Sequence, residues 1–209
     1  MNKYRVHLRF TEPILGTVPG NPDIYKEHIQ SKLEAEGNDN GSATDIEDEM
    51  ETLPEALEKG TTGFHRLEDG APALYDYAIK GFFKDACSML SRDPESGSAK
   101  LRAFRKVIDG LVFVFPRLIR LEVPEAEAIS ILVRPLRAQT AKGERVALAA
   151  SEACPAGTTC SFEILALGKI PKGLFREWLE YGALRGLGQW RNAGYGRFEA
   201  TLTEVEAAQ

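Results

Sequence analysis

Apolar and polar residues alternate strictly over residues 3–10 of this sequence. The apolar positions are Tyr4, Val6, Leu8 and Phe10, and the intervening basic positions are Lys3, Arg5, His7 and Arg9. A period of two is typical of a β-strand with one buried and one exposed face. The segment therefore predicts a strand whose exposed face carries three fixed positive charges and a histidine.

Later segments show either helical spacing of apolar residues or a composition rich in β-forming residues. Helical spacing predicts helices over 22–36, over 72–90 with a start near Asp76, and over 171–184, the last with Leu174, Phe175, Trp178, Leu179 and Ala183 inward. Segment 100–108 predicts a short helix or an irregular arm. The β-rich segments 111–115, 118–123 and 129–133 predict strands, and Pro135 is expected to bend or end the third. Segments 145–150 and 159–167 predict a strand pair around a turn at 155–158. A last strand follows from residue 198, where Phe198, Ala200, Leu202 and Val205 are separated by polar residues.

The order of these elements predicts the fold class. A strand, an insertion, a helix, several strands, a second helix, a glycine-rich loop and a final strand contain the order β-α-β-β-α-β. This predicts an α+β fold, a ferredoxin-like (RRM-like) antiparallel sheet with helices on one face. We expect a single domain over 1–209, interrupted after the first strand by an insertion at 20–60 with a short helix and an acidic, mobile segment.

Charge is distributed unevenly along the chain. The formal net charge is −5, from 26 Lys and Arg against 31 Asp and Glu, but residues 34–58 hold ten acids and no bases. Without that segment, 21 acids (31 − 10) face 26 bases, so the body is mildly basic and its charge permits a nucleic-acid partner. The sequence contains neither a membrane-length apolar run nor the apolar region of a signal peptide, and we expect a cytoplasmic protein with no membrane partner.

The three cysteines do not predict a metal site. Cys87 lies in a helical pattern, and Cys154 and Cys160 flank a turn. Their spacing is neither CxxC nor that of a zinc finger, so we expect idle thiols, no metal and no cofactor.

A glycine-rich segment near the C-terminus is the strongest candidate for a binding site. Five glycines lie within 182–196, and Arg185, Arg191 and Arg197 are spread among them. Glycine permits positive φ angles and close backbone approach, so the segment predicts a shaped loop. Exposed backbone N–H groups beside guanidinium groups can cradle phosphate. The alternative is a plain connection with solvated arginines.

Three stretches in order resemble the RAMP superfamily, the ferredoxin-like RNA-binding subunits and processing nucleases of CRISPR–Cas systems. They are 71–84, with Lys80-Gly81 near a helix start, 152–162, with a Pro-Ala-Gly-Thr hairpin, and the glycine-rich loop at 186–197. The resemblance covers 60–209 and the first strand. It implies binding of single-stranded RNA backbone along the sheet, the helix start and the glycine-rich loop. The leading hypothesis is a non-catalytic subunit of a CRISPR-like ribonucleoprotein that holds guide-like single-stranded RNA and assembles with related subunits or itself.

The resemblance and the charge pattern together select the candidate RNA-binding residues. Lys80 adds charge at a helix opening, and Trp190 and Tyr195 offer rings for base stacking, against the alternatives of core anchoring for Trp190 and an ordinary strand position for Tyr195. The candidates are Arg5, His7, Arg9, Lys80, Lys84, Arg185, Gly186, Gly188, Gln189, Trp190, Arg191, Gly194, Gly196 and Arg197.

Two alternative functions remain open. Some members of the superfamily cleave RNA without a metal, which requires a general base and a general acid. The weak catalytic candidates are His65, His7 and Asp23. The other alternative is an interaction or inhibitor protein of a mobile element that uses the acidic insertion to mimic nucleic-acid charge.

Overall fold

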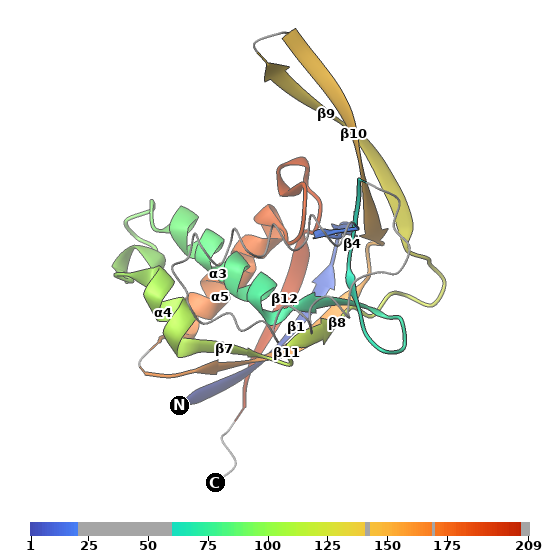
Figure 1. The fold of residues 1–209 in the computed structure, drawn as a ribbon. Coiled ribbons are helices and arrows are strands. Elements are labelled where there is room, and N and C mark those ends of the chain that lie inside the picture. The colour runs from blue at the N-terminus through green and yellow to red at the C-terminus, as the bar shows by residue number, and fades with distance from the viewer. Residues whose placement is uncertain (21–59, 141–142, 169, 206–209) are drawn as a thin grey trace, which may run out of the picture.

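The computed structural model describes residues 1–20, 60–140, 143–168 and 170–205 (Figure 1). The predicted insertion helix and the acidic segment lie outside these residues. The strands are β1 (Asn2–Phe10), β2 (Ile14–Leu15), β3 (Val18–Pro19), β4 (Thr61–Gly63), β5 (His65–Arg66), β6 (Pro72–Tyr75), β7 (Val112–Phe115), β8 (Leu118–Arg120), β9 (Ser130–Thr140), β10 (Gly143–Cys154), β11 (Thr159–Ala166) and β12 (Phe198–Val205). The helices are α3 (Asp76–Leu90), α4 (Phe104–Leu111) and α5 (Lys172–Arg185), with short 3-10 turns η1 (Ser98–Lys100) and η2 (Arg191–Ala193).

Strand β1 lies inside a four-stranded sheet of order β12-β1-β11-β7. It runs antiparallel to both β11 and β12, and β11 runs antiparallel to β7. The predicted alternation in β1 is confirmed, because its apolar side chains are buried and Arg5, His7 and Arg9 are exposed. The sheet therefore has one apolar face and one open face.

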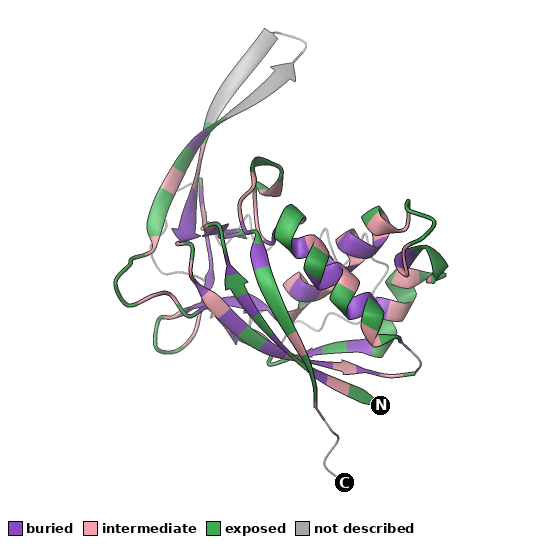
Figure 2. Ribbon diagram, turned by 180° about the vertical axis from the view of Figure 1, so that it is seen from behind, coloured by how far each residue is buried: buried purple, intermediate pink, exposed green. Residues whose placement is uncertain are grey.

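Helices α3 and α5 cover the apolar face of this sheet (Figure 1). Aromatic rings fill the interface: the Tyr4 and Phe175 centroids are 5.4 Å apart, and Phe83 and Phe175 each lie within 5.5 Å of Trp178. Figure 2 shows buried residues on the helix sides that are turned toward the sheet. Strong aromatic burial of this kind dominates core energetics, so these contacts fix both helices on the sheet.

One of the inward positions predicted for 171–184 is wrong. Ala183 of α5 is exposed, whereas Gly182 is buried, because the Phe198 ring occupies the space where a Cβ at 182 would lie, 2.0 Å from its nearest atom. The start of α3 at Asp76 agrees with the prediction, and 72–75 forms the short strand β6, in a three-stranded sheet of order β5-β6-β8.

The long strands β9 and β10 form a two-stranded ribbon that extends away from the body (Figure 1). They pair antiparallel from Gly143↔Thr140 to Ala153↔Ser130. The predicted pairing of 145–150 with 159–167 is therefore wrong, since β11 pairs with β1 and β7. Pro135 does not end the strand predicted at 129–133, because β9 continues past Pro135 to Thr140. Proline is tolerated in a strand with a neighbour on one side only.

The base of the ribbon belongs to a second sheet that contains β10, β9, β2, β4 and β3. Strand β4 runs parallel to β10, and β2 runs antiparallel to it. The chain is thus an α+β protein, as the sequence predicted, with strands that pair antiparallel except for β4 and β10. In the part of the chain that the structure describes, no helix is long and apolar enough to cross a membrane.

Candidate nucleic-acid interface

The glycine-rich loop between α5 and β12 is closed by contacts between its own two ends. The Leu187 N–H donates to the Gly196 carbonyl at 2.8 Å. Gly186 and Gly196 have φ angles of +78° and +70°, and a Cβ on Gly196 would lie 1.8 Å from the Leu187 carbonyl oxygen. Only glycine fits such close backbone approach, so these two glycines fix the shape of the loop.

Several loop amides are not available for phosphate, contrary to the predicted cradle. The donors that already bond within the chain are the N–H groups of Gly186, Leu187, Ala193, Gly194 and Gly196. Their acceptors are carbonyls of α5, of the loop itself and of Pro13. Because the loop is so tightly closed, its backbone bonds are satisfied locally. An anion at this loop must therefore be bound mainly by side chains.

Two of the three loop arginines converge on one carboxylate of α3. Arg185 Nε and Arg191 Nη1 lie 3.1 and 2.8 Å from Asp85 Oδ2. All three side chains are about a quarter exposed, with exposed fractions of 26%, 27% and 27%. The Arg197 Nε donates to the Leu184 carbonyl at 3.1 Å. Two guanidinium groups on one carboxylate leave a net positive charge, and each keeps further N–H donors.

Trp190 is a partly exposed ring of the loop. It is 38% exposed, so the alternative in which it anchors the core is wrong. Its ring stacks on Tyr195, with centroids 5.1 Å apart and planes 10° apart, and the Arg134 guanidinium carbon lies 5.0 Å from its centroid. Parallel rings and a cation near a ring are favourable arrangements, so the Trp190 ring is held in a defined orientation.

A buried polar cluster joins the loop to the second sheet, and the sequence analysis missed it. Gln189 Oε1 accepts a hydrogen bond from Arg134 Nη2 at 2.8 Å. Arg134 Nη1 donates to Ser151 Oγ at 2.9 Å, and Ser151 Oγ lies 2.7 Å from Thr62 Oγ1. Arg134 is only 6% exposed. Its fork therefore ties β9, β10 and the loop together. The signal that the sequence offers is a group of basic residues, Arg134, Arg137, Lys142 and Arg145.

A largely buried ion pair between Arg66 and Glu152 lies beside this cluster. Glu152 is 7% exposed, accepts a hydrogen bond from the Phe64 N–H at 3.0 Å, and pairs with Arg66. The nearby Cys154 thiol is also buried, and burial raises its pKa to about 12. Cys160 behaves in the same way. Both thiols are therefore protonated at neutral pH, as idle core cysteines are.

The open face of the four-stranded sheet is less cationic than predicted. Lys3 Nζ and Arg5 Nη2 lie 2.8 and 3.4 Å from the Glu163 carboxylate on β11, and Arg9 lies 3.9 Å from Glu199 on β12. Lys3, and then Arg5, hold the pKa of Glu163 below its usual value. These carboxylates come from strands that neighbour β1, so a single strand's pattern does not reveal them.

Lys80 and Lys84 contact α4. Lys80 Nζ donates to the Asp109 carbonyl at 3.1 Å and lies 5.7 Å from the centroid of Phe113. Lys84 Nζ lies 2.8 Å from Asp109 Oδ1. The next residue along α3, Asp85, reaches the loop instead. The structure therefore places Lys80 and Lys84 beside α4, and Arg185 and Arg191 at the glycine-rich loop.

The two catalytic candidates among the described residues, His65 and His7, lie in different sheets, β5 and β1. His65 is 3% exposed and packs edge-on against Tyr75, and burial lowers its pKa from 6.5 to about 4. A buried imidazole cannot reach the 2′-hydroxyl of an RNA bound at the surface. His7 is exposed on the open face, where its Nδ1 lies 3.0 Å from Ser161 Oγ. Asp23 lies outside the described residues. No group of three metal-ligating side chains occurs among the residues that the structure describes.

The fold resembles subunits of solved CRISPR assemblies. A chain in the cryo-EM structure of type III-B Cmr-beta bound to cognate target RNA matches with a TM-score of 0.54 and 13% identity, over 99% of this chain and 61% of that one. The likeness is one of fold. The chain spans about three fifths of that protein's length. A chain of a type IV-B CRISPR complex matches with a TM-score of 0.47 and 15% identity, over 99% of this chain and 92% of that one. No protein-family profile and no curated protein matches the sequence.

Proposed function

We propose that this chain is a RAMP-type, non-catalytic subunit that binds single-stranded RNA in a CRISPR-like ribonucleoprotein. In this proposal β1, α3, β7, β11, α5 and β12 form a ferredoxin-like domain. The sheet order β12-β1-β11-β7, with α3 and α5 on one face, supports that assignment. The fold likeness to a chain of type III-B Cmr-beta supports it as well.

The observation that carries the proposal is the convergence of Arg185 and Arg191 on one oxygen of Asp85. Arginine forks recognise carboxylate and phosphate oxygens with the same geometry, so this pair can also hold a phosphate. The stacked rings of Trp190 and Tyr195 lie in the same loop and offer an aromatic surface to a base. Arg197 lies next to β1, because its carbonyl accepts the Thr11 N–H at 2.9 Å.

In the proposed complex the RNA backbone passes from the glycine-rich loop toward β1. Arg9 is the exposed cation of β1 that lies nearest the loop along the strand, and His7 and Arg5 follow on the same face. A single strand held mainly by phosphate contacts binds with little sequence preference and with strong salt dependence. Related subunits or copies of the chain would continue the strand. The subunit positions RNA and leaves it intact.

The test is fluorescence anisotropy of a labelled single-stranded RNA titrated with the protein at several salt concentrations in EDTA. We expect binding at low salt, and we expect an Arg9→Gln/Arg191→Gln variant to reduce the slope of log K against log salt by about 1.4, since each phosphate contact on a single strand contributes roughly 0.7. Lys172→Gln/Arg176→Gln on α5 is the matched control, because it removes the same charge. No affinity at 50 mM salt would overturn the proposal, and cleaved RNA in EDTA would favour the endoribonuclease alternative.

A further inference from the structure

The segment that enters α4 carries four exposed basic residues within seven positions. Lys100, Arg102, Arg105 and Lys106 are all exposed, and none pairs with a carboxylate of the residues that the structure describes. Between them Ala103 has a φ of +51°, a left-handed conformation that costs a residue with a Cβ about 1–2 kcal/mol. Cations without carboxylate partners contrast with the glycine-rich loop, where Asp85 holds two arginines.

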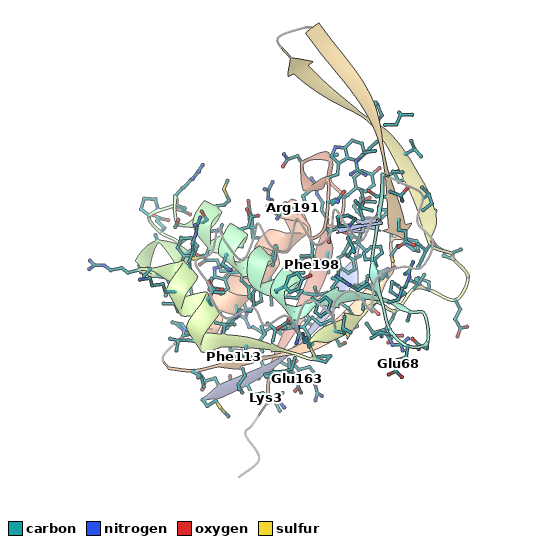
Figure 3. All side chains as sticks on the ribbon, viewed as in Figure 1. Lys3, Glu68, Phe113, Glu163, Arg191 and Phe198 are labelled. Atoms are coloured by element: carbon teal, nitrogen blue, oxygen red, sulfur yellow. The ribbon has the colours of Figure 1, made fainter. Side chains whose placement is uncertain are left out.

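Strand β7, which directly follows α4, exposes two aromatic rings. Phe113 and Phe115 are 37% and 50% exposed and alternate with buried valines. Phe115 pairs with Glu163, and Phe113 pairs with Leu165, so both rings share the open face with Arg5 and Lys3. Figure 3 shows Phe113, Glu163 and Lys3 together, on the side of the sheet away from the helices.

Contacts of Lys80 connect the basic segment to these rings. Its ammonium lies 3.1 Å from the Asp109 carbonyl on α4 and 5.7 Å from the Phe113 ring centroid. Arg105 precedes Asp109 by one helical turn and so lies on the same side of α4. We define the α4–β7 surface as Lys100, Arg102, Arg105, Lys106, Lys80, Phe113 and Phe115. Lys80 thus contacts both α4 and the Phe113 ring.

We propose that the α4–β7 surface is a second binding site for single-stranded nucleic acid, separate from the glycine-rich loop. Cations that follow the backbone together with rings that stack bases are the two parts of such sites. Rings two residues apart on a strand are separated by roughly 7 Å, about twice the 3.4 Å spacing of stacked bases. Two neighbouring bases that are unstacked from each other can therefore each stack on one ring. The inference rests on the proposed function, because it extends RNA binding to another surface.

Stacking predicts a specific pattern among aromatic variants. Phe113→Leu/Phe115→Leu keeps both positions apolar but removes the rings, and we expect it to weaken binding of a labelled oligouridylate about tenfold or more, given two lost stacks. Phe113→Tyr/Phe115→Tyr keeps the rings and should bind like the wild type. The melting temperature of each variant shows whether the fold is intact.

Charge variants separate this site from the loop. Arg105→Gln/Lys106→Gln should lower the salt slope by about 1.4, while Lys172→Gln/Arg176→Gln, at the β12 edge of the sheet, should not. If the wild type binds RNA and the α4–β7 variants bind equally well, this inference is wrong while the proposed function stands. If the wild type does not bind RNA, the proposed function itself fails. A self-association in sedimentation that the Leu variant abolishes, with RNA affinity unchanged, would instead make the rings a protein interface and overturn the site.

Discussion

Asp85→Asn tests the loop arginines most directly. The carboxylate accepts hydrogen bonds from Arg185 and Arg191, and so it occupies a position that a phosphate oxygen could take. The amide keeps the size of the side chain and one acceptor oxygen, but it removes the charge. The substitution therefore leaves two guanidinium groups beside a neutral partner. If this pair binds RNA phosphates, the variant should bind RNA more tightly than the wild type.

The magnitude follows from Coulomb's law. A phosphate roughly 6 Å from the Asp85 charge, at an effective dielectric constant of about 40, is repelled by about 1.4 kcal/mol, which corresponds to about tenfold in affinity. The two ion pairs are partly exposed, with side-chain exposures near a quarter, so losing their charge costs about 0.5–2 kcal/mol of stability. For a domain of this size that lowers the melting temperature by roughly 2–4 °C per kcal/mol.

The assay combines RNA anisotropy at low salt with thermal denaturation. Glu127→Gln, on an exposed loop, is the control, because it changes the net charge by the same amount without touching an arginine. We expect a gain in RNA affinity for Asp85→Asn that shrinks as salt is raised. An affinity equal to that of Glu127→Gln would refute the role of Arg185 and Arg191. A weaker affinity would refute the sign of the argument and show that Asp85 positions both arginines.

Three further predictions concern stability and are checked by urea or thermal denaturation. Gly196→Ala should destabilise the protein by more than about 2 kcal/mol, because a Cβ would meet the Leu187 carbonyl and the φ is positive, whereas Gly81→Ala, with open space in α3, should be neutral or stabilising. Equal melting temperatures for these two variants would contradict the described loop geometry. Arg134→Lys should lower the free energy of unfolding by about 1–3 kcal/mol, since an ammonium cannot reproduce both hydrogen bonds of the buried guanidinium. A urea midpoint equal to that of the wild type would argue against the polar cluster. Burial lowers the pKa of His65 to about 4 in the folded protein, below the unfolded value of 6.5. The stability that its neutral imidazole contributes is therefore complete above pH 6.5, and about 3 kcal/mol of it is lost as the pH falls toward 4. His65→Phe should flatten that part of the pH profile, and an unchanged slope would refute the assignment.

Local patterns were sufficient to predict the elements nearest the site. The alternation over 3–10 reports directly on which side chains of β1 are buried, and the start of α3 at Asp76 follows from helical spacing. The α+β class follows from the order of those elements. The glycine spacing at 182–196 predicted a shaped loop, because positive φ angles and close backbone contact are properties of individual residues.

Long-range pairing could not be predicted in this way. Segment 143–154 reads as a strand, but nothing local indicates that it pairs with β9 and not with β11. The same limit explains the charges: Glu163 and Asp85 come from other elements to meet Arg5, Arg185 and Arg191. The basic residues were visible in the sequence, whereas their neutralising partners depend on the sheet register and on how α3 packs.

The buried fork of Arg134 has a mechanical consequence. It joins Ser151, in β10 at the base of the projecting ribbon, to Gln189 in the loop, so the two share one rigid anchor. A displacement of the ribbon would therefore pull on the loop through Arg134. If a partner that binds the ribbon changes the affinity of the loop for its ligand, thermodynamic reciprocity requires the loop's ligand to change the partner's affinity for the ribbon by the same factor.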